Sequence, residues 1–161
     1  MKKIILTLIA VAATAVAASA QVGDVWAGAQ MNYGSKNSMV GLGAQVQVEV
    51  VNKLRVAPEF IYYFKNDGLK DYNVNLNLHY LINSGVEGFY IYPIAGFTYA
   101  RFSEDMPYGG VNNTNRFGAN IGCGAEYRIS SSPLSFFTEE RVQILKDWTQ
   151  SVTSMGIKYK F

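Results

Sequence analysis

The sequence predicts an all-β fold: an eight-stranded antiparallel up-and-down transmembrane β-barrel that follows a cleaved signal peptide. Three observations predict it. Apolar and polar residues alternate with a period of two in eight successive segments, several apolar faces carry aromatic residues at their ends, and the chain begins like an export signal. We therefore expect two parts, a signal peptide over residues 1–20 and a barrel domain over residues 21–161.

Residues 1–20 have the three parts of a secretory signal peptide. Two lysines follow Met1, the next fifteen residues are almost entirely apolar, and small residues stand at Ala18 and Ala20. We expect cleavage at Ala18, Ala20 and Gln21. A single membrane-spanning helix is the alternative, but the apolar run is shorter than the roughly 20 residues that a span needs. No cysteine follows the small residues, which argues against a lipid anchor.

The rest of the chain has equal numbers of basic and acidic residues. Without its first 20 residues the chain keeps 141, a length that fits one domain, with 12 basic and 12 acidic residues. This composition offers no basic field that would attract nucleic acid. Cys123 is the only cysteine, so we expect no internal disulfide.

Four segments alternate clearly between an apolar and a polar face: residues 40–50, 72–80, 117–127 and 153–161. In residues 72–80 the apolar face begins and ends with tyrosine, at Tyr72 and Tyr80, and asparagines occupy the other face. A strand that crosses a bilayer needs about 9–11 residues and aromatic girdles at both interfaces. These segments meet that description.

Four weaker segments complete the set: residues 25–33, 54–64, 89–102 and 135–145. Residues 89–102 are apolar on both faces, so the sequence leaves their phase open. Short links are expected at residues 51–53, 83–88 and 130–133, and the other connections at 34–37, 65–71, 103–115 and 146–149. With both chain ends in the periplasm, the first set forms periplasmic turns and the second set external loops, of which 103–115 is the longest.

The polar faces are predicted to point into the ring. Glycines such as Gly41, Gly118 and Gly124 share these faces and would make room inside a narrow barrel. The predicted interior charges are Glu49, Arg55, Glu59, Glu126, Arg128, Glu139, Arg141 and Lys158. They line a small pore or form a paired network that fills the ring. We favour the network, because eight strands enclose a space only as wide as side chains and buried charges must pair.

Four residues do not fit this scheme simply. Glu140 falls on the lipid face in mid-strand, where a charge is costly, and a bulge near Glu139 and Glu140 would turn it away. Pro58 and Pro93 each remove a donor from a strand ladder. Cys123 falls on the lipid face, where we interpret it as a small apolar contact.

The chain ends Met155-Gly156-Ile157-Lys158-Tyr159-Lys160-Phe161, with Ile157, Tyr159 and Phe161 on the apolar face and both lysines toward the ring. This ending resembles the C-terminal strand by which the barrel assembly machinery recognises outer-membrane proteins. Residues 21–161 as a whole resemble the small eight-stranded outer-membrane barrels of the OmpX-like and OmpA transmembrane-domain type. The resemblance implies a place in the outer membrane of a Gram-negative bacterium and contact with its lipid. Its patterns are specific for fold and weak for function.

Candidate chemistry is sparse. His79 is the only histidine and is predicted inside the barrel near the periplasmic end, away from outer-leaflet lipid, so we interpret it as structural. The sequence has no Cys/His spacing for a metal and no helix after its glycines to bind phosphate, so we expect no cofactor. Met106, Pro107 and Tyr108 in the longest loop are candidates for contact with a surface ligand.

Four functions stay open. We favour a structural, monomeric, non-enzymatic outer-membrane barrel with surface interactions through its external loops. The alternatives are a narrow porin-like pore for ions or small solutes, a lipid-modifying enzyme that uses His79, and a soluble periplasmic barrel that binds an apolar ligand.

Overall fold

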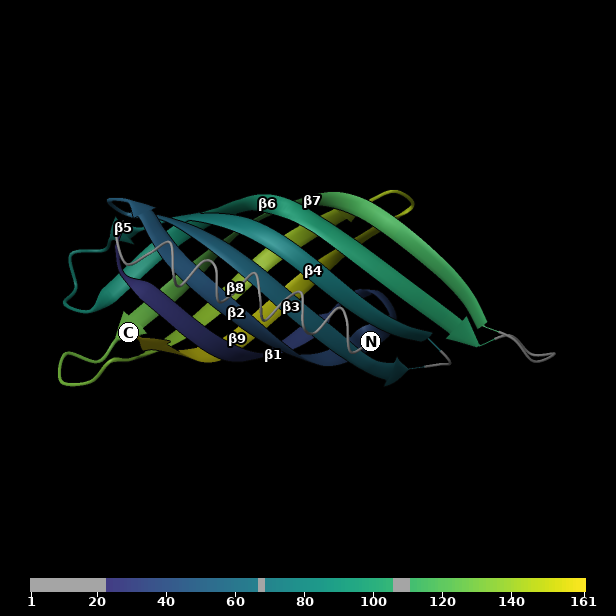
Figure 1. Cartoon of the computed structure of the whole chain (residues 1–161), viewed down its shortest axis with the longest axis horizontal. Helices are drawn as coiled ribbons and strands as arrows, with labels where there is room; N and C mark the ends of the chain where they lie inside the picture. The colour runs from purple at the N-terminus through teal and green to yellow at the C-terminus, as the bar shows by residue number, and fades with distance from the viewer. Residues whose placement is uncertain (1–22, 67–68, 106–110) are drawn as a thin grey trace.

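The computed structural model describes residues 23–66, 69–105 and 111–161 as one closed antiparallel barrel (Figure 1). Its elements are β1 (Val25–Gly34), η1 (Lys36–Ser38), β2 (Met39–Val51), β3 (Leu54–Asn66), β4 (Leu69–Tyr80), β5 (Ile82–Asn83), β6 (Phe89–Asp105), β7 (Val111–Arg128), β8 (Leu134–Leu145) and β9 (Trp148–Lys160). The predicted signal peptide and the loop residues Met106, Pro107 and Tyr108 lie outside the described residues. No helix among the described residues is long and apolar enough to cross a membrane.

The sheet closes through one pairing between strands distant in sequence, that of β1 with β9. The other pairs join strands that follow one another in the chain, with β4 paired to β6 and the short β5 also paired to β6. The start of β1 and the end of the chain therefore meet, and the Phe161 amide donates to the Val25 carbonyl at 2.9 Å. We call this the terminal end of the barrel, and the opposite end, where β6 and β7 project farthest, the loop end (Figure 1).

Pro93 explains why nine labelled segments form eight strands. β5 continues β4, because His79 pairs with Ile94 and Ile82 pairs with Ile91 in one register. The ladder is interrupted only between these pairs, opposite Pro93, which has no amide hydrogen to donate. The Leu81 amide instead donates to the Lys53 carbonyl at 2.7 Å. The predicted eight-stranded antiparallel barrel is thus confirmed.

Pro58 interrupts a second ladder. The pairing of β2 with β3 runs to Gln45 and Glu59 and resumes at Val48 and Val56, so the pair that would include Pro58 and the pair after it are missing. On its other side Pro58 stays in register with Leu76 of β4. Each proline therefore interrupts the ladder of backbone pairs on only one side of its strand.

The predicted loop over residues 103–115 is mostly strand. β6 reaches Asp105 and β7 begins at Val111, and these two residues pair. The segment was predicted as a loop because its polar residues show no apolar face. Outside a bilayer, a hairpin satisfies its backbone by its own ladder and needs no such face.

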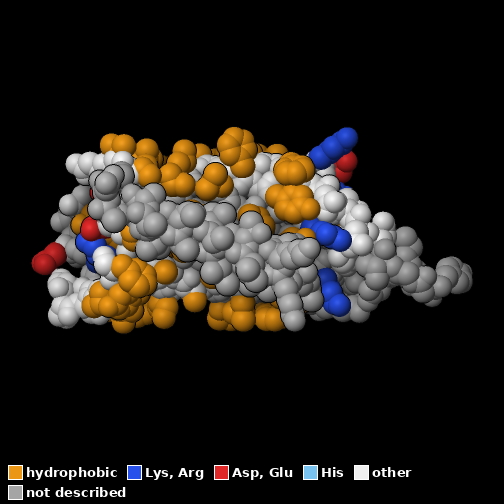
Figure 2. Space-filling view, in the orientation of Figure 1, with side chains coloured by type: hydrophobic (Ala, Val, Ile, Leu, Met, Phe, Trp, Pro, Cys, Tyr) orange, Lys and Arg blue, Asp and Glu red, His pale blue; other side chains and the backbone are white. Residues whose placement is uncertain are grey.

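The two faces of the wall differ as predicted. Hydrophobic side chains cover much of the outside (Figure 2), where Leu42, Leu76, Ile121 and Ile157 are exposed. Asparagine, glutamine and charged side chains are buried inside. In the segment whose phase was open, Ile91 and Phe97 face outward while Tyr92, Ile94, Thr98 and Phe102 are buried in the ring. An apolar exterior with a polar interior is the arrangement typical of barrels that span a bilayer.

An apolar layer lies inside the barrel at the loop end. Met39, Ile61 and Tyr63 pack together, with Leu69 against them. Leu69 also contacts a second group, formed by Ala100, Phe102, Leu145 and Trp148. The polar interior is therefore covered on its loop side by packed apolar side chains.

Candidate functional site

The predicted interior charges form two contact groups, one nearer the terminal end and one at mid-barrel, and the buried acid Asp71 of β4 lies in neither. Alternation places the side chains of the two groups inward from β2, β3, β7, β8 and β9, because every second residue of a strand faces the ring. All eight predicted residues lie in the interior or at its rim: Arg55, Glu59, Glu126, Glu139, Arg141 and Lys158 are buried, and Glu49 and Arg128 are partly exposed.

Glu126 is the centre of the first group and is fully buried. Its Oε2 lies 2.6 Å from Lys158 Nζ and 2.8 Å from Arg55 Nη1, and its Oε1 lies 2.8 Å from Arg128 Nε. Glu49 lies at the rim, 3.9 Å from Arg55 Nε. One carboxylate thus contacts three cations that come from three different strands.

Two neighbours complete this group. The Arg55 guanidinium lies 3.5 Å from the ring centroid of Trp26, whose side chain is buried. Gln47 Oε1 accepts hydrogen bonds from Arg55 at 3.0 Å and from Lys158 at 3.2 Å. The cations are therefore held by an aromatic face and an amide as well as by carboxylates.

Arg141 is the centre of the second group. Its Nη2 lies 2.8 Å from Glu59 Oε1 and its Nη1 lies 3.3 Å from Glu139 Oε2. Tyr92 donates its hydroxyl proton to Glu139 Oε1 at 2.9 Å. Glu59 also accepts from Gln30, and from Asn75 at 2.9 Å. The carboxylates are thus satisfied by a guanidinium, a phenol and amides.

A belt of amides extends from this second group toward the loop end. Asn120 Nδ2 donates to Asn75 at 3.1 Å and to Asn77 at 2.9 Å, and Gln143 donates to Thr98 at 2.8 Å. Sequence reasoning placed Asn75 and Asn77 inside but did not single out Asn120 or Gln143. It also missed Tyr92, because the phase of that strand was open.

Inward glycines leave the space that these side chains occupy. A Cβ on Gly124 would lie 2.5 Å from atoms of the Tyr92 ring, and one on Gly28 would lie 2.9 Å from Lys158 Cγ. The glycines on the polar faces therefore make room for large neighbours, as their pattern predicted.

Comparisons with known proteins agree with this geometry. The N-terminal β-barrel domain of Pseudomonas aeruginosa OprF matches 87% of this chain and 98% of its own, with a TM-score of 0.73 and 14% identity. Neisserial surface protein A matches 86% and 96%, with a TM-score of 0.64 and 20% identity. Yersinia pestis Ail, solved in complex with the heparin analogue sucrose octasulfate, matches 88% and 100%, with a TM-score of 0.61 and 15% identity.

The chain has the fold of the small outer-membrane β-barrels. No protein-family model matches the sequence, and no curated protein matches it. The resemblance noted in the sequence is thus confirmed at the level of fold. Within this barrel fold, His79 lies inside the ring, and the assembly residues of the C-terminal strand and Glu140 lie on the outer face.

His79 is buried inside the barrel and stacks on Tyr92, with ring centroids 4.9 Å apart. Neither of its ring nitrogens has a hydrogen-bond partner in the structure. In the part of the chain that the structure describes, no group of three or more His, Cys, Asp or Glu side chains is arranged to hold a metal ion.

The C-terminal strand pairs with β1, and its predicted assembly residues Ile157, Tyr159 and Phe161 are all exposed on the outside. Lys158 faces the ring as predicted. Lys160 lies on the same face of β9, paired with Trp26, and its Nζ lies 5.5 Å from the centroid of the buried Trp26 ring. The Lys160 side chain is partly exposed at the terminal end, where it forms an ion pair with Asp24. Lys160 is the last residue of β9, so it lies at the rim, where the carboxylate of a neighbouring segment is within reach.

The prediction of a bulge at Glu140 was wrong. β8 is in continuous register with both neighbours, and Glu140 pairs with Cys123 and with Thr153. The side chain stays on the outer face, where its carboxylate accepts hydrogen bonds from the hydroxyls of Ser151 and Thr153, the second at 2.5 Å. Hydroxyls on the adjacent strand, rather than a change in the backbone, accommodate this acid.

Proposed function

We propose that the chain is a non-conducting, non-enzymatic integral protein of a bacterial outer membrane, with a structural or surface-interaction role. The observation that carries this proposal is the sealed interior. Arg55 and Glu126 are 0% exposed and Arg141 and Lys158 are 1% exposed, so water does not reach the charges that would line a pore. The paired charges and the apolar layer at the loop end both support a filled ring.

Conductance in planar bilayers tests the sealed interior. The refolded barrel, verified by heat-modifiable migration on gels, is expected to give no discrete openings, whereas a known porin prepared in the same way conducts. Regular openings of one size would contradict the proposal and favour the narrow pore.

A catalytic role for His79 is disfavoured by its position. The ring is buried inside the wall and stacked on Tyr92, whereas a lipid substrate would reach the outer surface. We expect the variant His79→Ala to leave lipid A unchanged by mass spectrometry. A lipid A species that is present with the natural protein and missing with this variant would instead support a lipid-modifying enzyme.

We place the terminal end in the periplasm and the loop end outside the cell, because the β6–β7 hairpin projects farthest at the loop end, as the external hairpins of such barrels do (Figure 1). Labelling of whole cells with a membrane-impermeant maleimide tests this orientation. Asn113 and Asn83 are exposed near opposite ends. In a Cys123→Ser background, Asn113→Cys should react in intact cells, and Asn83→Cys should react only after the outer membrane is opened. The reverse pattern would overturn the orientation.

A surface-interaction role is favoured by the charges at the loop end. Lys36, Lys70, Arg101, Arg116 and Lys146 are at least partly exposed there, with the exposed acid Asp147 beside them, and the acids Glu104 and Asp105 end β6 at the same end. At the terminal end the charges are balanced, with Asp24, Glu49 and Glu87 against Lys53, Arg128 and Lys160. The exposed cations of the loop end, and the sulfated ligand of the similarly folded Ail, favour a polyanionic surface ligand.

Retention on a heparin column tests the polyanion. The double variant Lys70→Gln/Arg101→Gln should elute at clearly lower salt than the natural protein. The matched control Lys53→Gln/Lys160→Gln removes the same charge from the terminal end and should elute with little change. Equal shifts for both variants would indicate a dependence on net charge alone and contradict a loop-end site.

A further inference from the structure

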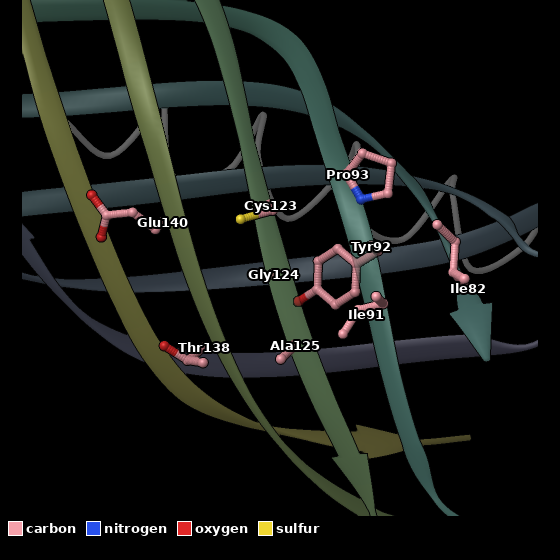
Figure 3. A pocket seen from close by; sticks show the side chains of 9 residues that line it. All are labelled: Ile82, Ile91, Tyr92, Pro93, Cys123, Gly124, Ala125, Thr138 and Glu140. Carbon is pink, nitrogen blue, oxygen red and sulfur yellow. The ribbon is translucent and has the colours of Figure 1, made fainter. Parts of the chain in front are cut away.

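Two hollows among the described residues offer little to an anionic ligand. A groove of about 560 Å³ on the outer wall is lined mainly by apolar and small side chains, and its one charged residue is the acid Glu140 (Figure 3). A second pocket, of about 250 Å³ at the terminal end, is lined by Glu49 as well as by Lys53 and Arg128, and Arg128 is already paired with Glu126. Neither hollow presents two cations without a carboxylate beside them, so a polyanion is better held at the loop end.

Trp148, the first residue of β9, lies in the mouth of the barrel at the loop end. It packs on the apolar layer, where its ring centroid lies 4.7 Å from that of Phe102. Lys36 Nζ lies 4.4 Å from the centroid of the same indole, and Arg116 Cζ lies 5.6 Å from it. The sum of these two distances, 10.0 Å, is the largest separation that the two charges can have. One aromatic ring therefore holds two cations close together.

Hydrogen bonds hold both cations to the β8–β9 hairpin. In the segment before η1, the Ser35 amide donates to the Ser151 carbonyl and the Ser151 amide donates to the Ser35 hydroxyl, each at 2.9 Å. Lys36 follows Ser35 directly. Arg116 Nη1 donates to the Lys146 carbonyl in the β8–β9 turn at 2.7 Å. The two cations come from different hairpins and are positioned by the same third one, so the arrangement is preorganised.

Neither charge is neutralised by an acid in the part of the chain that the structure describes. No ion pair of the described side chains includes Lys36 or Arg116, and the exposed Asp147 of the adjoining turn pairs with neither. An indole face and a carbonyl attract a cation but leave its net charge in place. Because like charges held this close repel each other, the arrangement favours an anion that bridges them.

The two cations differ in the anions that suit them. A guanidinium presents a fork of donors, whereas an ammonium is a point charge with three donors. A sulfate or phosphate ester has three acceptor oxygens, so it can accept from both cations, and neighbouring esters on a glycan can occupy one each. A carboxylate has two oxygens, which the guanidinium alone can occupy. The pair Lys36 and Arg116 therefore favours ester oxyanions over carboxylates.

The position in the mouth favours a soluble glycan over a lipid headgroup. Arg116 shares the inward face of β7 with the buried Asn120. Arg101 precedes the buried Phe102 in β6, so it faces outward. Headgroups at the edge of the leaflet would meet Arg101, whereas the mouth opens to the medium.

We propose that Lys36, Arg116 and Trp148 form a binding site for the sulfate or phosphate esters of a soluble glycan. Trp148 positions the two cations, and the apolar layer beneath it keeps the ligand out of the sealed interior. This inference rests on the surface-interaction role proposed above and adds to it the residues and the chemistry of the ligand.

Titration of a short probe tests the site. In phospholipid nanodiscs the variant Trp26→Phe keeps Trp148 as its only indole, so the emission of Trp148 reports binding. A fully sulfated heparin tetrasaccharide should change this emission saturably. The same tetrasaccharide after desulfation keeps its carboxylates and should bind about tenfold more weakly. Equal affinities of the two probes would overturn the preference for esters.

Two double variants and one single variant separate a built site from net charge. Lys36→Gln/Arg116→Gln should weaken the binding of the sulfated tetrasaccharide about tenfold or more. Lys70→Gln/Arg101→Gln removes the same charge from the outer side of the same end and should weaken it by less, about threefold at most, because a short probe in the mouth does not reach these residues.

Trp148→Leu keeps every charge but removes the ring that holds the two cations. Calorimetry should show the affinity for the sulfated tetrasaccharide falling about fivefold. Heat-modifiable migration verifies that each variant barrel has folded. Equal losses in the two double variants, or an unchanged affinity in folded Trp148→Leu, would overturn the proposal.

Lipopolysaccharide added to the nanodiscs distinguishes the source of the esters. If this lipid alone changes the emission of Trp148 and displaces the tetrasaccharide, the ligand is a phosphate of the leaflet and the proposal of a soluble glycan fails. Heparin-column retention of the natural protein tests the surface role separately. Retention that Lys36→Gln/Arg116→Gln leaves unchanged would keep that role and overturn only this site.

Discussion

Glu139 and Glu140 are consecutive residues of β8 that face opposite sides of the barrel wall. Glu139 is buried in the ring, where it lies 3.3 Å from the Arg141 guanidinium and accepts a hydrogen bond from Tyr92 at 2.9 Å. Glu140 is exposed on the outer face, where the hydroxyls of Ser151 and Thr153 are its partners. Both side chains are carboxylates, and they differ in the partners that neighbouring strands supply: a guanidinium and a phenol inside, and two hydroxyls outside.

The difference shows that the inside of a closed barrel offers a carboxylate more partners than the outside does. Inside, residues from strands far apart in sequence converge, so Glu139 shares Arg141 with Glu59, 80 positions away along the chain. Outside, the surface curves away, and only the adjacent strand reaches Glu140. Interior carboxylates should therefore contribute to stability, whereas the exterior one should lower it.

The largest expected effect is at the centre of the first interior group. Glu126→Ala leaves Arg55 and Lys158 buried without their shared carboxylate, and we expect a loss of about 3–5 kcal/mol in the free energy of unfolding. Urea unfolding in phospholipid vesicles measures it. The control Glu49→Ala removes a partly exposed rim carboxylate and should cost less than about 1 kcal/mol. Similar losses for the two variants would contradict the special role of the buried position.

Glu139→Ala should have an intermediate effect. Arg141 keeps Glu59, but the buried Tyr92 hydroxyl loses its acceptor, so we expect a loss of about 1–3 kcal/mol by the same measurement. Adding Tyr92→Phe to this variant removes the unsatisfied hydroxyl and should recover part of the loss. No recovery would show that the cost lies with Arg141 rather than with the phenol.

Glu140→Leu should have the smallest effect and the opposite sign. An apolar side chain on the lipid face avoids the transfer of a carboxyl group into hydrocarbon, so we expect the barrel to gain about 1 kcal/mol. The measurement uses a low protein-to-lipid ratio, at which association of copies does not contribute. A loss of stability as large as that of Glu139→Ala would mean that the hydroxyl contacts of Glu140 hold β8 to β9, and the comparison between the two faces would fail.

The interior charges show how much of the candidate site is readable from sequence. All eight predicted residues lie in the interior or at its rim, because inward and outward positions follow from a local period of two. Their partners were not predictable. Glu126 meets Lys158 and Arg55 across the ring, and such contacts depend on how the strands stagger when the sheet closes.

The inward direction of the Tyr92 and Trp26 side chains was not predictable from the sequence. Aromatic residues in membrane strands usually face the lipid interface, yet both of these rings are buried inside, one donating to Glu139 and the other lying against Arg55. Tyr92 fits because Gly124 on the next strand has no side chain, and this pairing is a matter of register between strands. The sequence left the phase of the Tyr92 strand open because both of its faces are apolar.

The sequence by itself determined the strand count, the alternation of faces and the inward placement of the eight predicted charges, because all three depend on residues within one strand. It did not single out Asp71, which was expected in a connection and is buried in β4. Only the tertiary structure decided the rest. It showed that Pro93 interrupts one ladder rather than a strand, that Lys160 lies at the rim, and that Glu140 stays outward on a straight strand beside Ser151 and Thr153. These outcomes depend on neighbours that ring closure brings together from distant parts of the chain.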